Sequence, residues 1–220
     1  MIYVAPEHEF EAAHGLPSAL PKDERIIWQG SPDVKSLAKH AFHVPTLAAY
    51  FVLLLVLRGA LAMSDGVGLA EALRSVALLA PLAVIGVGLV ALLAWLVARS
   101  AVYTLTNRRV VMRIGVVLNI TFNLPLKTIG SAGLKLHSDG TGDIPLTLTT
   151  DDNIAYPHLW PHARPWQLKR TQPMLRCVPH AANVGQLLAE AAAVENLALS
   201  RSASTTPVQQ PIRDDWATAA

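Results

Sequence analysis

The sequence predicts a membrane-anchored protein in which a hairpin of two transmembrane helices precedes an antiparallel β domain closed by a C-terminal helix. Two long apolar runs predict the hairpin, and a change of hydrophobic period after residue 98 predicts the strands. The composition agrees, because 52% of the 220 residues are hydrophobic, 15% are charged and the mean hydropathy is +0.35. We expect an N-terminal cytoplasmic segment over 1–43, the hairpin over 44–98, the cytoplasmic β domain over 99–197 and a flexible tail over 198–220.

The two apolar runs have the length and composition of membrane spans. The first covers residues 44–63 and contains one charged residue, Arg58, whereas the second covers residues 76–98 and contains none. At about 1.5 Å per residue, runs of this length cross a bilayer core of roughly 30 Å. A polar turn over 64–75 joins them. A pair of buried helices in a soluble α protein is disfavoured, because the second run lacks the polar stripe that such helices need.

Basic residues near the ends of the runs predict the orientation of the hairpin. Lys35 and Lys39 precede the first run and four arginines follow the second, whereas the turn offers Arg74 alone. Lysine and arginine are enriched on the cytoplasmic side of a membrane. We therefore expect a multi-pass protein of the bacterial inner (intracytoplasmic) membrane, with both termini in the cytoplasm and the turn in the periplasm.

Arg58 lies five positions from the end of the first run, which gives it two interpretations. In the favoured interpretation, its long side chain snorkels to the membrane–water interface. The alternative is a polar contact with a partner helix, so Arg58 is a candidate partner-binding residue. Small residues at 86, 88, 91, 94 and 98 in the second run permit close packing against the first run, or against a second copy in a homodimer.

Alternation of apolar and polar residues after Arg99 predicts antiparallel strands. It is clear over residues 109–114, 118–124 and 144–148, and turn residues fall at Gly115, Pro125, 139–142 and 151–153. Six or seven strands between residues 102 and 178 fit a small β sandwich or barrel. Residues 182–197 have apolar positions at helical spacing and should close it.

Seven antiparallel strands with a closing C-terminal helix match the plan of a pleckstrin-homology (PH)-like barrel. Four segments resemble the PuhB family of photosynthetic complex assembly proteins from purple bacteria, which are membrane-anchored PH-domain proteins. These segments are GLP with LP over 15–21, ERIIWQGSP over 24–32, YTLTNRRVVMRIG over 103–115 and HLWPHARPW over 158–166. The resemblance covers roughly residues 15–195. It implies a non-enzymatic factor that assembles the reaction centre and its light-harvesting complex, with the polypeptides of both as partners.

The HLWPHARPW segment supplies the other candidate partner-binding residues: His158, Trp160, His162, Arg164 and Trp166. Exposed aromatic and arginine side chains are the usual anchors of protein interfaces. Three prolines in and beside the segment are expected to keep it out of helical structure, which also disfavours a metal site at His158, His162 and His180. The alternative is that the two tryptophans only close the barrel.

The remaining motifs exclude several function classes. The sequence contains no glycine-rich phosphate loop after a strand, no nucleophile elbow and no zinc-protease motif, so we expect no catalytic residue, no cofactor and no metal. Residues 139–143 are interpreted as a hairpin turn rather than a calcium loop. The single cysteine, Cys177, excludes an intrachain disulfide. A pigment carrier is disfavoured because His40 and His43 lie only at the entrance of the first helix.

The basic character of the predicted β domain leaves a second function open. Residues 99–180 carry 10 basic and 4 acidic side chains, a net charge of +6. On a membrane-bound domain this charge indicates anionic lipid or an acidic partner rather than nucleic acid. The alternative function is therefore a general membrane-anchored PH protein that binds anionic lipid or a signalling partner.

Overall fold

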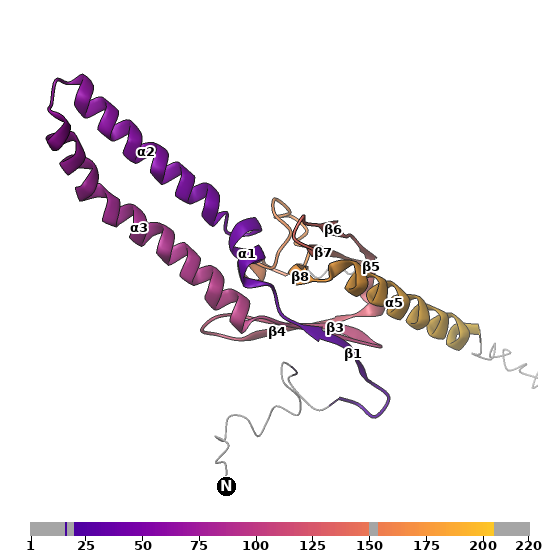
Figure 1. Ribbon diagram of the computed structural model, residues 1–220. Helices are drawn as coiled ribbons and strands as arrows, with labels where there is room; N and C mark the ends of the chain where they lie inside the picture. Colours follow the sequence, from indigo (N-terminus) through magenta and orange to yellow (C-terminus); the bar gives the residue numbers. More distant parts are fainter. Residues whose placement is uncertain (1–15, 17–19, 150–153, 205–220) are drawn as a thin grey trace, which may run out of the picture.

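The computed structural model describes residues 16, 20–149 and 154–204, and shows a long two-helix hairpin that projects from a β-rich domain (Figure 1). In chain order the elements are β1 (Ile26–Gly30), α1 (Val34–His40), α2 (Val44–Ser64), α3 (Leu69–Ser100), β2 (Val102–Thr106), β3 (Arg109–Ile114), β4 (Ile120–Pro125), η2 (Leu126–Thr128), β5 (Ile129–Ala132), β6 (Lys135–Leu136), β7 (Thr141–Leu148), α4 (Tyr156–Leu159), β8 (Met174–Pro179) and α5 (Ala181–Ser204).

Helices α2 and α3 are the predicted hairpin, and both are long and apolar enough to cross a membrane. They lie side by side, with most of their large apolar side chains exposed (Figure 1). Helix α3 begins earlier than expected, because residues 69–75, which were assigned to the turn, form its first two turns. Gly68 is the N-cap, and Glu71 in the first turn interacts favourably with the helix dipole.

The base of the hairpin is packed against the β domain through helix α1. Asp33 caps α1, with its Oδ1 accepting a hydrogen bond of 2.8 Å from the Ser36 amide. Leu37 of α1 packs in one buried cluster with Val97 of α3 and Cys177 of β8. The hairpin and the β domain are therefore joined by side-chain packing as well as by the chain itself.

The strands form two antiparallel sheets that are not closed into the expected barrel. The first sheet has the order β1-β2-β3-β4, and in the second β7 pairs with β5, β6 and β8. After β4 the chain makes the 3₁₀ turn η2, and β5 then pairs with β7 instead of continuing the first sheet. The turn predicted at Gly115 is confirmed: its φ is 125°, and a Cβ there would clash with the carbonyl of Leu118.

Strand β1 comes from the segment that we expected to lie outside the β domain. It pairs with β2 from Ile26 opposite Thr106 to Gly30 opposite Tyr103. Just before β1, the buried carboxylate of Glu24 accepts hydrogen bonds of 2.8 and 3.0 Å from the Arg109 guanidinium. The first sheet is thus assembled from chain on both sides of the hairpin.

Helix α5 covers the core of the β domain, as the apolar spacing of its sequence predicts. Val184 and Leu188 of this helix pack in one cluster with Tyr103, Met112 and Leu146. The helix continues to Ser204, past residue 197, where the apolar spacing predicts its end. The remainder of the predicted tail, residues 205–220, lies outside the described residues, as do residues 1–15 and 17–19.

Candidate functional site

A pocket of about 950 Å³ lies where the base of the hairpin meets the second sheet and the loop between α4 and β8. Three of the candidate residues predicted from the sequence, Trp160, Arg164 and Trp166, line it. Helix α1 contributes His40 to its wall, and the β6–β7 region contributes His137 and Asp143. The pocket therefore brings together an aromatic and basic segment with a polar cluster that is distant in sequence.

The loop that carries Trp160 and Trp166 is held in place by hydrogen bonds, whereas the two tryptophan side chains are exposed. We expected its prolines to exclude helical structure, but the segment starts with the single helical turn α4. Pro157 lies in the first turn of this helix, where proline is tolerated. His158 is exposed on the surface of α4. Farther along, the Arg164 amide and guanidinium each donate a hydrogen bond of 2.9 Å to Gln172. Trp160 is 50% exposed and Trp166 is 94% exposed. Neither tryptophan closes the core, which was the alternative interpretation.

His162 lies in the core of the β domain and not at the surface. Its side chain is 1% exposed, and its Nδ1 lies 2.6 Å from the hydroxyl of Tyr103 in β2. Burial lowers the pKa of His162 to about 3 and raises the pKa of Tyr103 above its usual value, so both are neutral near pH 7. His162 therefore fixes the loop to the first sheet and presents nothing to a partner.

Two stacked histidines and Asp143 form the polar side of the pocket, and Asp139 lies beside His40. The rings of His40 and His137 are parallel, with centroids 4.0 Å apart. The Nε2 atom of His40 lies 3.4 Å from Asp139, and that of His137 lies 3.3 Å from Asp143. Burial lowers the pKa of His40, and the neighbouring ring of His137 lowers it further. Hydrogen bonds from Thr141 hold the pKa of Asp139 well below its usual range.

Arg176 of β8 connects this polar side to the loop. Its Nη1 donates a hydrogen bond of 3.2 Å to the carbonyl of Pro161, and its Nε lies 4.0 Å from Asp143. The aromatic side of the pocket is held to the connection between α1 and α2 by an edge-to-face contact between Phe42 and Trp160, with ring centroids 5.7 Å apart. The arrangement offers a partner apolar surface, cationic groups and hydrogen-bonding groups in one place.

Comparison with known proteins identifies the family. Residues 45–192, more than half of the chain, match the bacterial PH domain family. The chain belongs to the bacterial PH domain family. It is also 40% identical, over 188 residues, to an uncharacterised 23.7 kDa protein in the puhA 5′ region of Rhodobacter capsulatus, a match that covers 84% of this chain and 87% of the relative. No solved structure gives a significant match to the chain.

The sequence predicts the exposed part of this PH-domain site but not its polar side. Trp160, Arg164 and Trp166 are close in sequence, so one segment indicates them. His40 and His137 come from elements 97 residues apart in the chain and follow no spacing motif. A turn lies at residues 138–140, so the turn predicted at 139–142 is confirmed in part, and residues 141 and 142 already belong to β7. The sequence around it gives no sign that His137 and Asp143 line a pocket.

Arg58 lies far from this pocket, near the turn of the hairpin. It is exposed and lines a separate hollow of about 410 Å³ that also includes Asp65, Glu71 and Arg74. Its side chain thus shares a polar environment with the residues of the turn. The interpretation that Arg58 reaches the membrane interface stays a prediction.

Proposed function

We propose that this bacterial PH-domain protein is a non-enzymatic, membrane-bound assembly factor for the photosynthetic reaction centre and its light-harvesting complex. The observation that carries the proposal is the exposed rim of Trp160, Arg164 and Trp166 around a pocket of about 950 Å³ at the base of the apolar hairpin. A polypeptide newly inserted in the membrane leaves the bilayer at this level. The rim is therefore placed to contact its cytoplasmic end, while α2 and α3 contact its transmembrane helix.

The chemistry of the rim suits a protein partner. Tryptophan and arginine dominate interface hot spots, because each offers a large contact area and directional polar groups. The base of the loop is fixed by the pairing of Arg164 with Gln172 and by the burial of His162. A side chain presented on a fixed loop loses less conformational freedom on binding than one on a mobile loop.

Two similarities support the photosynthetic partner. The relative from Rhodobacter capsulatus is named for its position in the puhA 5′ region. In addition, the segments over 24–32, 103–115 and 158–166 resemble the PuhB family of assembly proteins, and the last of them forms the rim of the pocket. We therefore take nascent reaction-centre and light-harvesting polypeptides as the partners.

The topology of the sheet supports a location with both ends of the hairpin on the same side of the membrane, and the basic residues beside the hairpin favour the cytoplasmic side. Strand β1 precedes the hairpin and β2 follows it, yet the two strands are paired. Both ends of the hairpin must then lie on one side of the membrane. A reporter fused after Ala220 should be active only in its cytoplasmic form, and one inserted at Gly66 should report the periplasm. Activity of a periplasmic reporter at the C-terminus would contradict this orientation.

Changing Arg164 and Trp166 to alanine together is expected to reduce reaction-centre absorbance while leaving the amount of this protein normal. Both side chains are exposed and outside the core, and the backbone hydrogen bond from Arg164 to Gln172 that holds the loop remains in the alanine variant. The loss of a hot-spot side chain costs about 2 kcal/mol or more, which weakens binding about 30-fold. The measurement is reaction-centre absorbance and co-purification of its polypeptides, compared with the immunoblotted amount of this protein in the same cells.

The matched control replaces Arg108 and Leu118 with alanine, since both are exposed but neither lines the pocket. This control should leave absorbance and co-purification unchanged. If the rim variant leaves both unchanged as well, the loop is not the partner site and the hairpin with Arg58 becomes the candidate. If it instead reduces salt-sensitive binding to anionic vesicles without any effect on the reaction centre, the general lipid-binding function is favoured, as the charge of +6 over residues 99–180 would suggest.

A further inference from the structure

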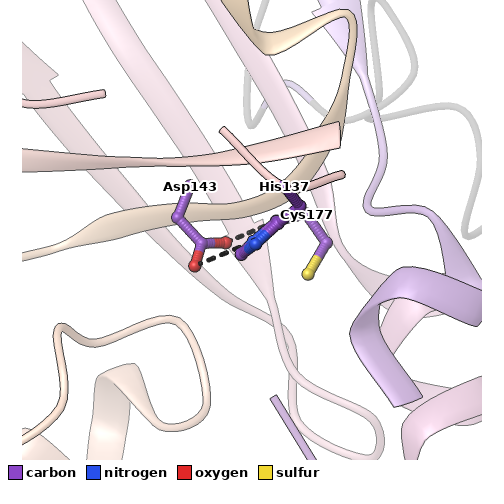
Figure 2. Close-up of side chains that lie close together, drawn as sticks. All are labelled: His137, Asp143 and Cys177. Carbon is purple, nitrogen blue, oxygen red and sulfur yellow. Dashed lines mark hydrogen bonds and ion pairs between the residues drawn. The ribbon is translucent and has the colours of Figure 1, made fainter. Parts of the chain in front are cut away.

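A cluster of three side chains with metal-binding atoms lies beside the pocket: His137 and Asp143 line it, and the buried Cys177 lies behind them (Figure 2). They come from the turn before β7, from β7 itself and from β8, and their ligand atoms all lie within 4.8 Å of one another. Figure 2 shows the imidazole of His137 between the carboxylate of Asp143 and the side chain of Cys177. The fold thus brings a nitrogen, an oxygen and a sulfur donor to one place.

The imidazole of His137 is buried without a hydrogen-bond partner at Nε2. Its side chain is 6% exposed, and Nε2 lies 3.3 Å from Asp143 Oδ2 without the geometry of a hydrogen bond. Buried polar atoms are nearly always paired, and an unpaired one destabilises the fold. The unpaired Nε2 atom of His137 faces a carboxylate oxygen, so the two atoms are suited to bind one cation between them.

Strand β8 holds Asp143 in place through its Oδ1 atom. Oδ1 accepts a hydrogen bond of 2.9 Å from the Cys177 amide and lies 4.0 Å from Arg176 Nε. Oδ2 is the atom that faces His137. Protein metal sites commonly orient a ligating carboxylate in this way, through hydrogen bonds to the oxygen that does not bind the metal.

We propose that His137 Nε2, Asp143 Oδ2 and Cys177 Sγ bind a zinc ion, with a water molecule from the pocket in the fourth position. Imidazole and thiolate are ligands that zinc prefers, whereas calcium and magnesium take oxygen ligands. Atoms that lie about 2.0–2.3 Å from one tetrahedral ion are about 3–4 Å apart. The cluster therefore needs only small side-chain rotations to close around the ion.

Zinc binding at this cluster replaces a thiol proton. Burial raises the pKa of Cys177 to about 12, so the thiol is protonated when no metal is bound. As the sulfur–zinc bond forms, the S–H bond breaks and the proton passes to solvent, with no change in the oxidation state of either atom. Because Cys177 packs against Leu37 and Val97, the ion would couple the base of the hairpin to the second sheet.

The test uses the full chain, purified in detergent without a polyhistidine tag and stripped of metal by a chelator. Cobalt(II) is the probe, because it occupies zinc sites and absorbs through charge transfer when a thiolate is its ligand. We expect one cobalt ion per chain, with a thiolate charge-transfer band that stoichiometric zinc abolishes. Zinc should also raise the melting temperature, since a ligand that binds only the folded state stabilises it.

Variants of the cluster separate this site from adventitious binding. His137→Gln, Asp143→Asn and Cys177→Ser should each weaken metal binding at least about 100-fold, and Cys177→Ser should also remove the charge-transfer band. The exposed His158 gives the matched control, and His158→Gln should bind as the wild type does. Circular dichroism of each metal-free variant checks that its fold is kept.

Two results would overturn the proposal. The first is the absence of a charge-transfer band from the wild-type protein, which does not depend on any variant folding. The second is equal metal binding by the wild type and by folded Cys177→Ser and His137→Gln variants. Neither result bears on the partner-binding rim, because the proposed assembly function does not require the ion.

Discussion

A chain that begins at Ser31, and therefore lacks β1, is expected to lose the folded β domain. Strand β2 is buried along its whole length and would become the edge of the first sheet, with the hydrogen-bonding groups that now pair with β1 left open. Ile27 and Trp28 also pack against the main core and would be lost. The truncated protein should be degraded in cells and should show no cooperative thermal transition when purified.

Two soluble variants isolate this effect from membrane insertion. One joins residues 20–43 to residues 97–204 through about ten Gly and Ser residues, which span about 17 Å on average. The other joins residues 31–43 to residues 97–204 through the same linker, so that it keeps α1 but lacks β1. We expect a cooperative melting transition by circular dichroism in the first and none in the second. Equal transitions in both variants would show that the β domain does not need β1 to fold.

Replacing Glu24 with glutamine is expected to lower the free energy of unfolding by about 2–3 kcal/mol. The Glu24 side chain is 3% exposed and accepts hydrogen bonds from Arg109 and Thr106, so the change leaves the partly buried Arg109 guanidinium without its counter-charge. The melting temperature should fall by about 5–10 °C. Arg108→Ala is the control and should change stability by less than about 0.5 kcal/mol, because that side chain is 54% exposed and lies 4.0 Å from Asp23.

The ion pair between Glu24 and Arg109 should also make the folded protein less stable at low pH. Burial opposes the ionisation of Glu24, but hydrogen bonds from Arg109 and Thr106 outweigh it and leave the pKa of Glu24 below its usual value of 4.5. The unfolded chain then binds a proton more readily than the folded one. The stability from this pair is present above about pH 4.5 and is lost as the pH falls through the lowered pKa. The melting temperature of the wild type should therefore fall more steeply below pH 4.5 than that of Glu24→Gln; parallel curves would contradict this.

The sequence predicts the parts of this fold whose signal is local. A continuous apolar run predicts α2 and α3, because a helix that is apolar on all sides has no polar positions. Alternation by two predicts β3, β4 and β7, because a strand with one buried face has an apolar residue at every second position. It does not predict that residues 26–30 pair with residues 102–106. That pairing forms because the hairpin brings the chain back beside residues 26–30. The sequence of so short a strand gives no sign of which segment it pairs with.

The same distinction separates the two halves of the candidate site. Trp160, Arg164 and Trp166 lie within seven residues, so a single segment reveals them. His137, Asp143 and Cys177 are spread over 41 residues and lack any ligand spacing that the chain itself could display. His162 was expected at the surface with its neighbours, but the burial of residues 161–163 in an irregular, proline-rich loop follows no period that the sequence shows.

The position of β1 ahead of the hairpin also imposes an order on biosynthesis. The ribosome completes β1 first, and about 70 residues, including both hairpin helices, must follow before β2 exists. At about 5–20 residues per second, β1 waits roughly 4–14 s for its partner. In the proposed topology, the sheet can then form only if the second helix has returned the chain to the side where β1 remained. Completion of the cytoplasmic fold is thus a check on membrane insertion: a chain with one helix inserted wrongly keeps an unpaired β2 and exposes itself to proteolysis.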